Sequence, residues 1–224
     1  VGALRAMPLH TSGTLPLSER EISIIARLGS GSAARSIFGG FVSLANKQTS
    51  QQENDAIDSA YAEQIAPPSH WPLHDIIIVP TMEEKKVGST EGHHMAHTSS
   101  LFPKRIEAIT KRRQQECIDA ILKKDFEALQ SVTEEDCWDM HNVMQTQAPP
   151  LQYLNDETYR ITEEIEDLRA QQHLPVLYTM DAGPTVHLFC EEEAVDAIRV
   201  YAHAQKNCTI FEAKIGKGAE LIEN

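Results

Sequence analysis

The chain has 224 residues, enough for one large domain or two smaller ones, and 41% of them are hydrophobic, which supports a proper core. Its formal net charge of −13 excludes the broad basic surface typical of nucleic-acid binding. No apolar run approaches the length of a membrane span, and the first residues lack the pattern of a signal peptide. We therefore expect a globular protein whose partners include neither nucleic acid nor membrane.

The first predicted elements are a helix and a glycine-rich loop. A capping box from Ser18 to Glu21 and the apolar spacing after it predict a helix of about three turns. The stretch Gly29–Gly40, GSGSAARSIFGG, follows with four glycines, three serines and Arg35. Accessible backbone N–H groups, hydroxyls and a guanidinium together suit an anion. A tight turn without a ligand is the structural alternative.

Beyond this loop, the Pro-rich residues 67–72 are the best domain boundary, giving predicted domains 1–72 and 73–224. The predicted strands are 41–44, 61–65, 75–80, 176–180, 186–190 and 209–214, of which 75–80 is expected to be buried on both faces. The predicted helices are 103–124, with a core stripe of Ile106, Ile109, Ile118 and Ile121, and then 125–145, 156–171 and 194–205. This order predicts an α+β sandwich.

The cysteines and histidines give little sign of a metal site. No two of the four cysteines have C-x-x-C spacing, which favours free thiols in a reducing cytosol. These are Cys117, Cys137, Cys190 and Cys208. His93 and His97 would share a helix face, but no H-E-x-x-H pattern is present. We expect a surface loop or a helix start there and predict no metal ligands.

Three further places combine polar groups with turn residues. The stretch Lys85–Thr90 is basic and rich in hydroxyls, with a solvated loop as the alternative. Asn155 or Asp156 is more readily explained as a helix cap than as a functional group. Asp181 ends an apolar strand before Ala-Gly-Pro, where it either forms the turn or acts as a base or a cation ligand.

Several of these stretches together resemble a known family. ARLGSGSAARSIFGGFVSL, SHWP, KKVGSTEG, APPLQYLND, YTMDAGPTVHLF and KIGKGAELI occur in this order. They are similar to the mevalonate diphosphate decarboxylases of the GHMP kinase superfamily, over nearly the whole chain. The resemblance implies a two-domain GHMP kinase fold, with a remnant of an N-terminal ribosomal-S5-like domain and a ferredoxin-like C-terminal α/β sandwich.

The resemblance also implies a reaction. Family members phosphorylate the tertiary 3-hydroxyl of (R)-5-diphosphomevalonate with ATP and Mg²⁺. Loss of that phosphate drives decarboxylation to isopentenyl diphosphate, CO₂ and ADP, a step of the mevalonate pathway toward isoprenoids and sterols. A cytoplasmic homodimer is the expected state. The alternatives are a GHMP small-molecule kinase that does not decarboxylate and a non-catalytic remnant.

The resemblance assigns roles to particular residues of this sequence. Asp181 matches the aspartate that acts as base or orienter at the 3-hydroxyl, and Arg35 matches the arginine that meets the substrate carboxylate. The expected substrate-binding residues are Ser30, Gly31, Ser32, Arg35 and Ser89. In this scheme Arg35 fixes the carboxylate for C–C cleavage, and Asp181 faces the positive charge that develops at C3.

The sequence departs from the family pattern mainly at the front. The family's lysine- and tyrosine-containing motif and its serine-rich ATP loop are not found, and Val1–Met7 matches the helix after that loop. We therefore expect this chain to correspond to roughly the C-terminal two thirds of an enzyme and not to turn over ATP by itself. Smaller departures, at Ala34, Thr185 and His93, are expected to affect pocket shape only.

Overall fold

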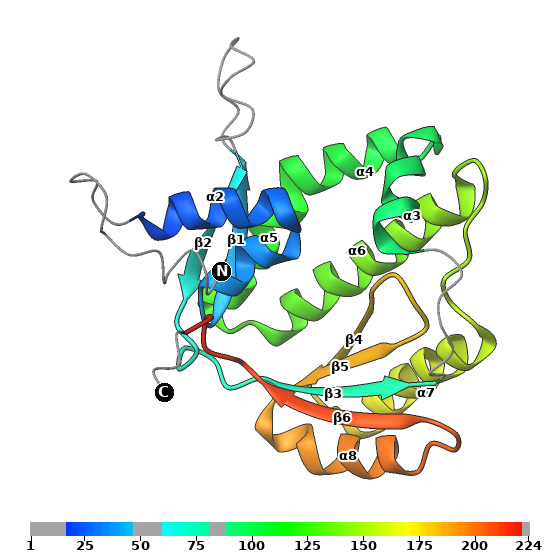
Figure 1. The fold of residues 1–224 in the computed structure, drawn as a ribbon. Coiled ribbons are helices and arrows are strands. Elements are labelled where there is room, and N and C mark those ends of the chain that lie inside the picture. Colours follow the sequence, from blue (N-terminus) through cyan, green and yellow to red (C-terminus); the bar gives the residue numbers. More distant parts are fainter. Residues whose placement is uncertain (1–16, 47–59, 81–87, 221–224) are drawn as a thin grey trace. The chain divides into compact units, whose positions relative to one another are not determined.

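The computed structural model describes residues 17–46, 60–80 and 88–220, and the expected helix end at Val1–Met7 lies outside them. The chain divides into two compact units. The first unit combines residues 1–71 with 215–224, and the second unit comprises residues 72–214. Figure 1 shows the helices and strands of both units.

The described part of the first unit is a helix and a short helical turn packed against a two-stranded antiparallel sheet. Its elements are α2 (Glu19–Gly29), the 3₁₀ helix η1 (Ser32–Ile37), β1 (Phe41–Asn46) and β2 (Ala60–Ala66). The predicted capping box is confirmed, because the Ser18 hydroxyl accepts from the Glu21 N–H and the Glu21 carboxylate accepts from the Ser18 N–H. Buried Ile22 and Ile37 form a small core between α2 and η1.

The glycine-rich stretch is more ordered than the predicted loop. Ser30 closes α2 by donating its N–H to the Ala26 carbonyl, and η1 begins two residues later. Ala34 and Ile37 are buried, so η1 gains the hydrophobic burial that a solvated loop would lack. The Gly and Ser residues at the start of the stretch signalled a loop, but the tertiary packing favours a helical turn.

The end of the described chain returns to the first unit, although the predicted boundary assigned it to the second domain. The Gly216 carbonyl accepts from the Gly40 N–H at 2.9 Å, and the Ala219 N–H donates to the Ser36 carbonyl at 2.8 Å. A Cβ on Gly218 would lie 2.4 Å from the Ile37 carbonyl oxygen, so only glycine allows this close approach.

The second unit contains a four-stranded antiparallel sheet in the order β4-β5-β3-β6 (Figure 1). Its strands are β3 (His74–Val79), β4 (Val176–Met180), β5 (Val186–Cys190) and β6 (Thr209–Lys214). This order, with helices between β3 and β4 and between β5 and β6, is the ferredoxin-like arrangement. The sequence prediction of these four strands is confirmed, and with it the α+β class.

One expectation for β3 is wrong. Its residues alternate between buried and half-buried, with Ile76 and Ile78 in the core and Ile77 and Val79 on the other face. The uninterrupted β-branched run suggested burial on both faces, but an antiparallel sheet needs only one face covered. The second face of this sheet therefore has room for polar side chains.

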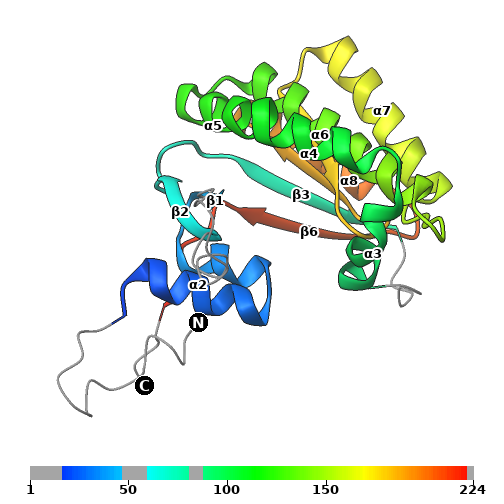
Figure 2. The ribbon, with the colours of Figure 1, turned by 90° about the horizontal axis from the view of Figure 1, so that it is seen from above.

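The helices of the second unit follow the predicted order. They are α3 (Ser89–Met95), η3 (Ala96–Thr98), α4 (Phe102–Ala108), the π-helical η4 (Ile109–Arg113), α5 (Gln114–Lys123), α6 (Phe126–Thr146), α7 (Asp156–Gln172), η5 (Glu192–Ala194) and α8 (Val195–His203). In Figure 2, α6 and α7 lie together on one side of the sheet. The main core joins Ile161 and Ile165 of α7 and Ile198 of α8 to the buried face of the strands. Within the described residues, none of these helices has both the length and the apolar character of a membrane span.

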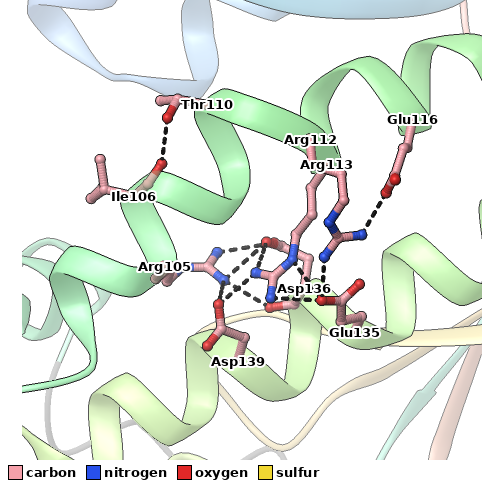
Figure 3. Close-up of polar contacts among 9 residues, drawn as sticks. All are labelled: Arg105, Ile106, Thr110, Arg112, Arg113, Glu116, Glu135, Asp136 and Asp139. Atoms are coloured by element: carbon pink, nitrogen blue, oxygen red, sulfur yellow. Dashed lines mark hydrogen bonds and ion pairs between the residues drawn. The ribbon is translucent and has the colours of Figure 1, made fainter.

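The predicted helix 103–124 differs in detail because it contains the π-helical segment η4. A π turn holds one residue more than an α turn, so it rotates the faces before and after it relative to each other. Ile121 is buried, but Ile106, expected in the core stripe, is 45% exposed. Arg113 takes a buried position instead and pairs with acidic residues of α6 (Figure 3).

Candidate functional site

Asp181 directly follows β4 and opens the turn to β5. Its side chain is exposed, and it forms no hydrogen bond or ion pair within the part of the chain that the structure describes. The turn is closed by the backbone, since the Gly183 N–H donates to the Asp181 carbonyl at 2.8 Å. An aspartate that merely shaped this turn would accept backbone N–H groups with its carboxylate. The Asp181 carboxylate instead remains available to a ligand.

The backbone on both sides of Asp181 is held by helices. The Met180 N–H donates to the Cys137 sulfur at 3.2 Å, and the Met180 carbonyl accepts from His141 Nε2 at 3.3 Å, both on α6. On the other side, the Thr158 hydroxyl of α7 donates to the Pro184 carbonyl at 2.9 Å. A free carboxylate on a backbone fixed at both ends is a preorganised acidic group.

Burial sets the charge state of the groups beneath this turn. Burial lowers the pKa of His141, so its imidazole is neutral near pH 7 and donates from Nε2 to the Met180 carbonyl. Burial likewise raises the pKa of the Cys137 thiol, which keeps it protonated and unreactive. The two groups beneath the Asp181 turn are therefore both neutral near pH 7.

The second unit also contains Ser89, a predicted substrate-binding residue. It is the first residue of α3, and its side chain lies outside the described part, as do Lys85 and Lys86. The Tyr153 hydroxyl donates to the Gly88 carbonyl at 3.2 Å, and the Tyr153 ring meets the His141 ring edge-on at a centroid distance of 6.4 Å. Tyr153 thus connects the start of α3 to the support of Asp181.

The first unit carries the predicted anion-binding residues. Ser30, Gly31, Ser32 and Arg35 are all exposed, and the Ser30 and Ser32 hydroxyls lie 3.1 Å apart. Among the described residues, the Arg35 guanidinium has no ion pair. Arg35 lines an open depression of about 340 Å³ together with Ser32, Ser36, Phe38, Gly40 and Val42. An unpaired guanidinium beside hydroxyl groups is suited to an anionic ligand.

The glycines of this stretch divide into two kinds. Gly40 has a φ of +74°, and a Cβ there would lie 2.3 Å from the Ala66 carbonyl oxygen, so its role is structural. Nothing lies within 4 Å of a Cβ built on Gly29 or Gly31. Packing does not require glycine at these two positions, which leaves the backbone open to a ligand.

The other polar sequence features have structural explanations. Asn155 caps α7 by accepting the Thr158 N–H at 2.9 Å, which confirms the structural alternative for that motif. His93 and His94 lie in α3, so the helix start expected there is present. Among the described residues, no group of three or more His, Cys, Asp or Glu side chains is arranged to hold a metal ion.

The sequence did not single out the groups that support Asp181. His141 and Cys137 lie in the middle of the predicted helix 125–145, and Thr158 lies in the first turn of α7. Polar residues within an otherwise amphipathic helix were the available signal, but which face they occupy depends on packing against β4. His187, on β5, was likewise read only as part of a strand.

A ferredoxin-like sheet with an exposed aspartate in its β4–β5 turn, in a chain that also carries a glycine- and serine-rich stretch with Arg35, is the arrangement of a GHMP-type fold. Family models agree: the mevalonate 5-diphosphate decarboxylase C-terminal domain matches residues 75–219, and the diphosphomevalonate decarboxylase-like N-terminal domain matches residues 3–57. The chain belongs to the mevalonate 5-diphosphate decarboxylase family.

Individual relatives support the same assignment. Diphosphomevalonate decarboxylase of Debaryomyces hansenii is 38% identical over 182 residues, covering 80% of this chain and 46% of that protein. The Rattus norvegicus enzyme is 39% identical over 180 residues, covering 79% of this chain and 44% of that protein. The chain thus spans about half the length of these curated relatives.

Solved structures resemble this fold over most of the chain. The mevalonate diphosphate decarboxylase of Staphylococcus aureus superposes with a TM-score of 0.77 at 30% identity, covering 92% of this chain and 61% of that one. A structure described as MDDEF in complex with MVAPP, AMPPCP and magnesium gives a TM-score of 0.80 at 30% identity, with coverages of 93% and 62%.

Proposed function

We propose that this chain supplies the substrate-binding and catalytic residues of an ATP-dependent diphosphomevalonate decarboxylase. The product would be isopentenyl diphosphate, formed with CO₂, ADP and phosphate. The observation that carries the proposal is the exposed, unpaired Asp181 carboxylate on a turn fixed by α6 and α7. The family membership and the names of the relatives support the same reaction.

The proposed chemistry uses two charged groups. Asp181 accepts the proton or hydrogen bond of the tertiary 3-hydroxyl, which is a poor nucleophile without such help. Its charge also stabilises the positive charge that develops at C3 when phosphate leaves. Arg35 binds the carboxylate that is lost as CO₂, because its planar guanidinium offers two parallel N–H donors. Ser30, Gly31, Ser32 and Ser89 are proposed to bind the diphosphate.

ATP and Mg²⁺ are the proposed cosubstrate and metal. One similar structure was solved with AMPPCP and magnesium, a ligand set that matches an ATP-dependent step. The described residues form no three-ligand metal centre, but Mg²⁺ bound to nucleotide phosphates needs only one or two protein carboxylates. When bound, ATP and Mg²⁺ would supply the transferred phosphoryl group and neutralise its charge.

The test is Asp181→Asn in the longest natural protein that contains these 224 residues. Asparagine keeps the shape but removes the proton acceptor and the charge, so kcat should fall at least about a hundredfold, the low end for loss of a general base. KM and melting temperature should change little. A variant that keeps its kcat but melts earlier would show that Asp181 only shapes the turn.

Product analysis separates the reaction classes in the same assay. CO₂ and isopentenyl diphosphate identify a decarboxylase, whereas a phosphorylated product with its carboxylate retained identifies a kinase. A cytoplasmic homodimer acting in isoprenoid and sterol synthesis is also proposed from the family resemblance. Sedimentation analysis and localisation of a tagged protein would test these two further points.

A further inference from the structure

Two polar side chains, Asp75 and His187, lie on the half-exposed face of the sheet in the second unit. In the antiparallel register, Asp75 pairs with Phe189, and Ile77 pairs with His187. Side chains alternate between faces along a strand, so Asp75 and His187 share the face opposite to buried Ile76. They are diagonal neighbours across two strands.

His187 and Asp75 form a directed ion pair. His187 Nδ1 donates to Asp75 Oδ2 at 2.9 Å, and the two side chains are only 27% and 16% exposed. The second carboxylate oxygen of Asp75 is buried without a hydrogen-bond partner among the described residues. Among the described residues, the His187 imidazole is thus the side chain that hydrogen-bonds this largely buried carboxylate. The imidazole also stacks on Phe189 at a centroid distance of 6.4 Å, which fixes its plane.

The same imidazole lies beside Asp181. His187 pairs with Thr179 on β4, and Asp181 directly follows the last residue of that strand, two positions beyond Thr179. The two side chains are close enough for their charges to interact. The hydrogen bond to Asp75 raises the pKa of His187, burial opposes this rise, and the charges of Asp75 and Asp181 add to it.

No other ionisable side chain of the neighbouring strands faces His187 on this side. His74 of β3 and Tyr178 of β4 have the opposite parity; His74 bonds Glu192 and Tyr178 bonds Glu166. The charged groups that act on His187 are Asp75 and Asp181. With His187 protonated, these three side chains carry a net charge of −1, and with His187 neutral they carry −2.

We propose that His187, held by Asp75, determines how well the region around Asp181 tolerates an anionic substrate. This inference rests on the proposed function. The chain has a formal net charge of −13, so a carboxylate- and diphosphate-bearing substrate approaches against a repulsive field. When protonated, His187 is a fixed cation beside Asp181. Its charge offsets that of Asp75, the other carboxylate, and leaves the Asp181 carboxylate itself unpaired.

The first test measures the coupling without any enzyme assay. The imidazole of His187 is titrated by NMR in the 224-residue chain and in the variants Asp75→Asn and Asp181→Asn. Both variants should lower the pKa of His187, Asp75→Asn more strongly because it also removes the hydrogen bond. An unchanged titration in Asp181→Asn would overturn the proposal, since His187 would not sense Asp181.

The second test uses the longest natural protein that contains the chain and compares His187→Gln with the control His203→Gln. One unit charge at roughly 8 Å in a partly solvated site changes affinity by about fivefold. Below the pKa of His187, His187→Gln should therefore raise KM for diphosphomevalonate about fivefold, with kcat changed less than about twofold. The wild-type KM should rise as pH increases through that pKa, and the variant should lack this rise. Exposed His203, on α8, should give wild-type values.

The outcomes separate the two proposals. Absence of decarboxylation by the wild-type protein at every pH would refute the proposed function. The affinity of wild type and His187→Gln for inorganic pyrophosphate would then be compared in place of KM. An active wild type whose KM matches that of His187→Gln across the pH range would refute the role of His187 alone. Asp75→Asn keeps the histidine and should shift the pH dependence of KM to lower pH. This variant therefore tests the proposal even if His187→Gln misfolds.

Discussion

Replacement of Arg113 by methionine tests whether the ion pairs of this buried arginine hold the π-helical segment on α6. The Arg113 side chain is 9% exposed, and it pairs with Asp139 at 2.5 Å, Glu135 at 3.0 Å and Asp136 at 3.2 Å (Figure 3). Methionine retains the apolar stem and removes the charge, so packing changes little. The variant therefore reports mainly the loss of the pairing.

The expected magnitude follows from the surroundings of Arg113. Removing one partner of a fully buried pair costs roughly 3–5 kcal/mol, and exposed pairs contribute at most about 1 kcal/mol. Asp136 and Asp139 are 39% and 24% exposed and remain paired with Arg105, so the stranded charges are partly compensated. We expect Arg113→Met to lower the stability by roughly 2–3 kcal/mol. For a chain of this size, that corresponds to a melting temperature lower by roughly 4–12 °C.

The neighbouring arginine provides the matched control. Arg112 is 44% exposed and pairs with Glu116 and Glu135, so Arg112→Met should melt close to the wild type. Both variants are compared by thermal and urea unfolding followed by circular dichroism. Two results would refute the reasoning: equal melting temperatures for Arg113→Met and the wild type, or a larger drop in melting temperature for Arg112→Met. Either would mean that the buried Arg113 does not stabilise the fold more than the exposed Arg112.

Three further predictions address the site and its supports. Arg35→Lys should weaken substrate binding and slow turnover together, because lysine offers no planar two-point donor; unchanged kinetics would make Arg35 a purely structural residue. Gly92→Ala should destabilise the packing of α3 by about 1–3 kcal/mol in urea unfolding, since the added Cβ would lie 2.1 Å from the Tyr153 hydroxyl oxygen, and Tyr153→Phe should partly restore it. Burial lowers the pKa of His141, so its contribution to stability is present above the unfolded pKa of about 6.5 and is lost as pH falls. The melting temperature of His141→Gln should accordingly fall less between pH 7 and pH 5 than that of the wild type, and parallel curves would contradict this.

The elements of the fold were readable from the sequence because their signals are local. Apolar spacing, the capping box at Ser18 and the turn residues around Gly183 act within a few positions of each other. The same locality made Asp181 and the Gly29–Gly40 stretch recognisable as candidate sites, since their residue types stand in unbroken motifs. Features that depend on tertiary burial were missed, among them the 3₁₀ helix η1, in which Ile37 is buried, and the single buried face of β3.

The tertiary structure decided what depends on residues far apart in the chain. A π turn moved Ile106 out of the core face and buried Arg113, which no helical periodicity predicts. His187 meets Asp75, 112 positions earlier, only because β3 and β5 pair in one particular register. The sequence by itself therefore determined the elements and the acid at the strand end, whereas strand register and helix packing decided which side chains support that acid and which charges surround it.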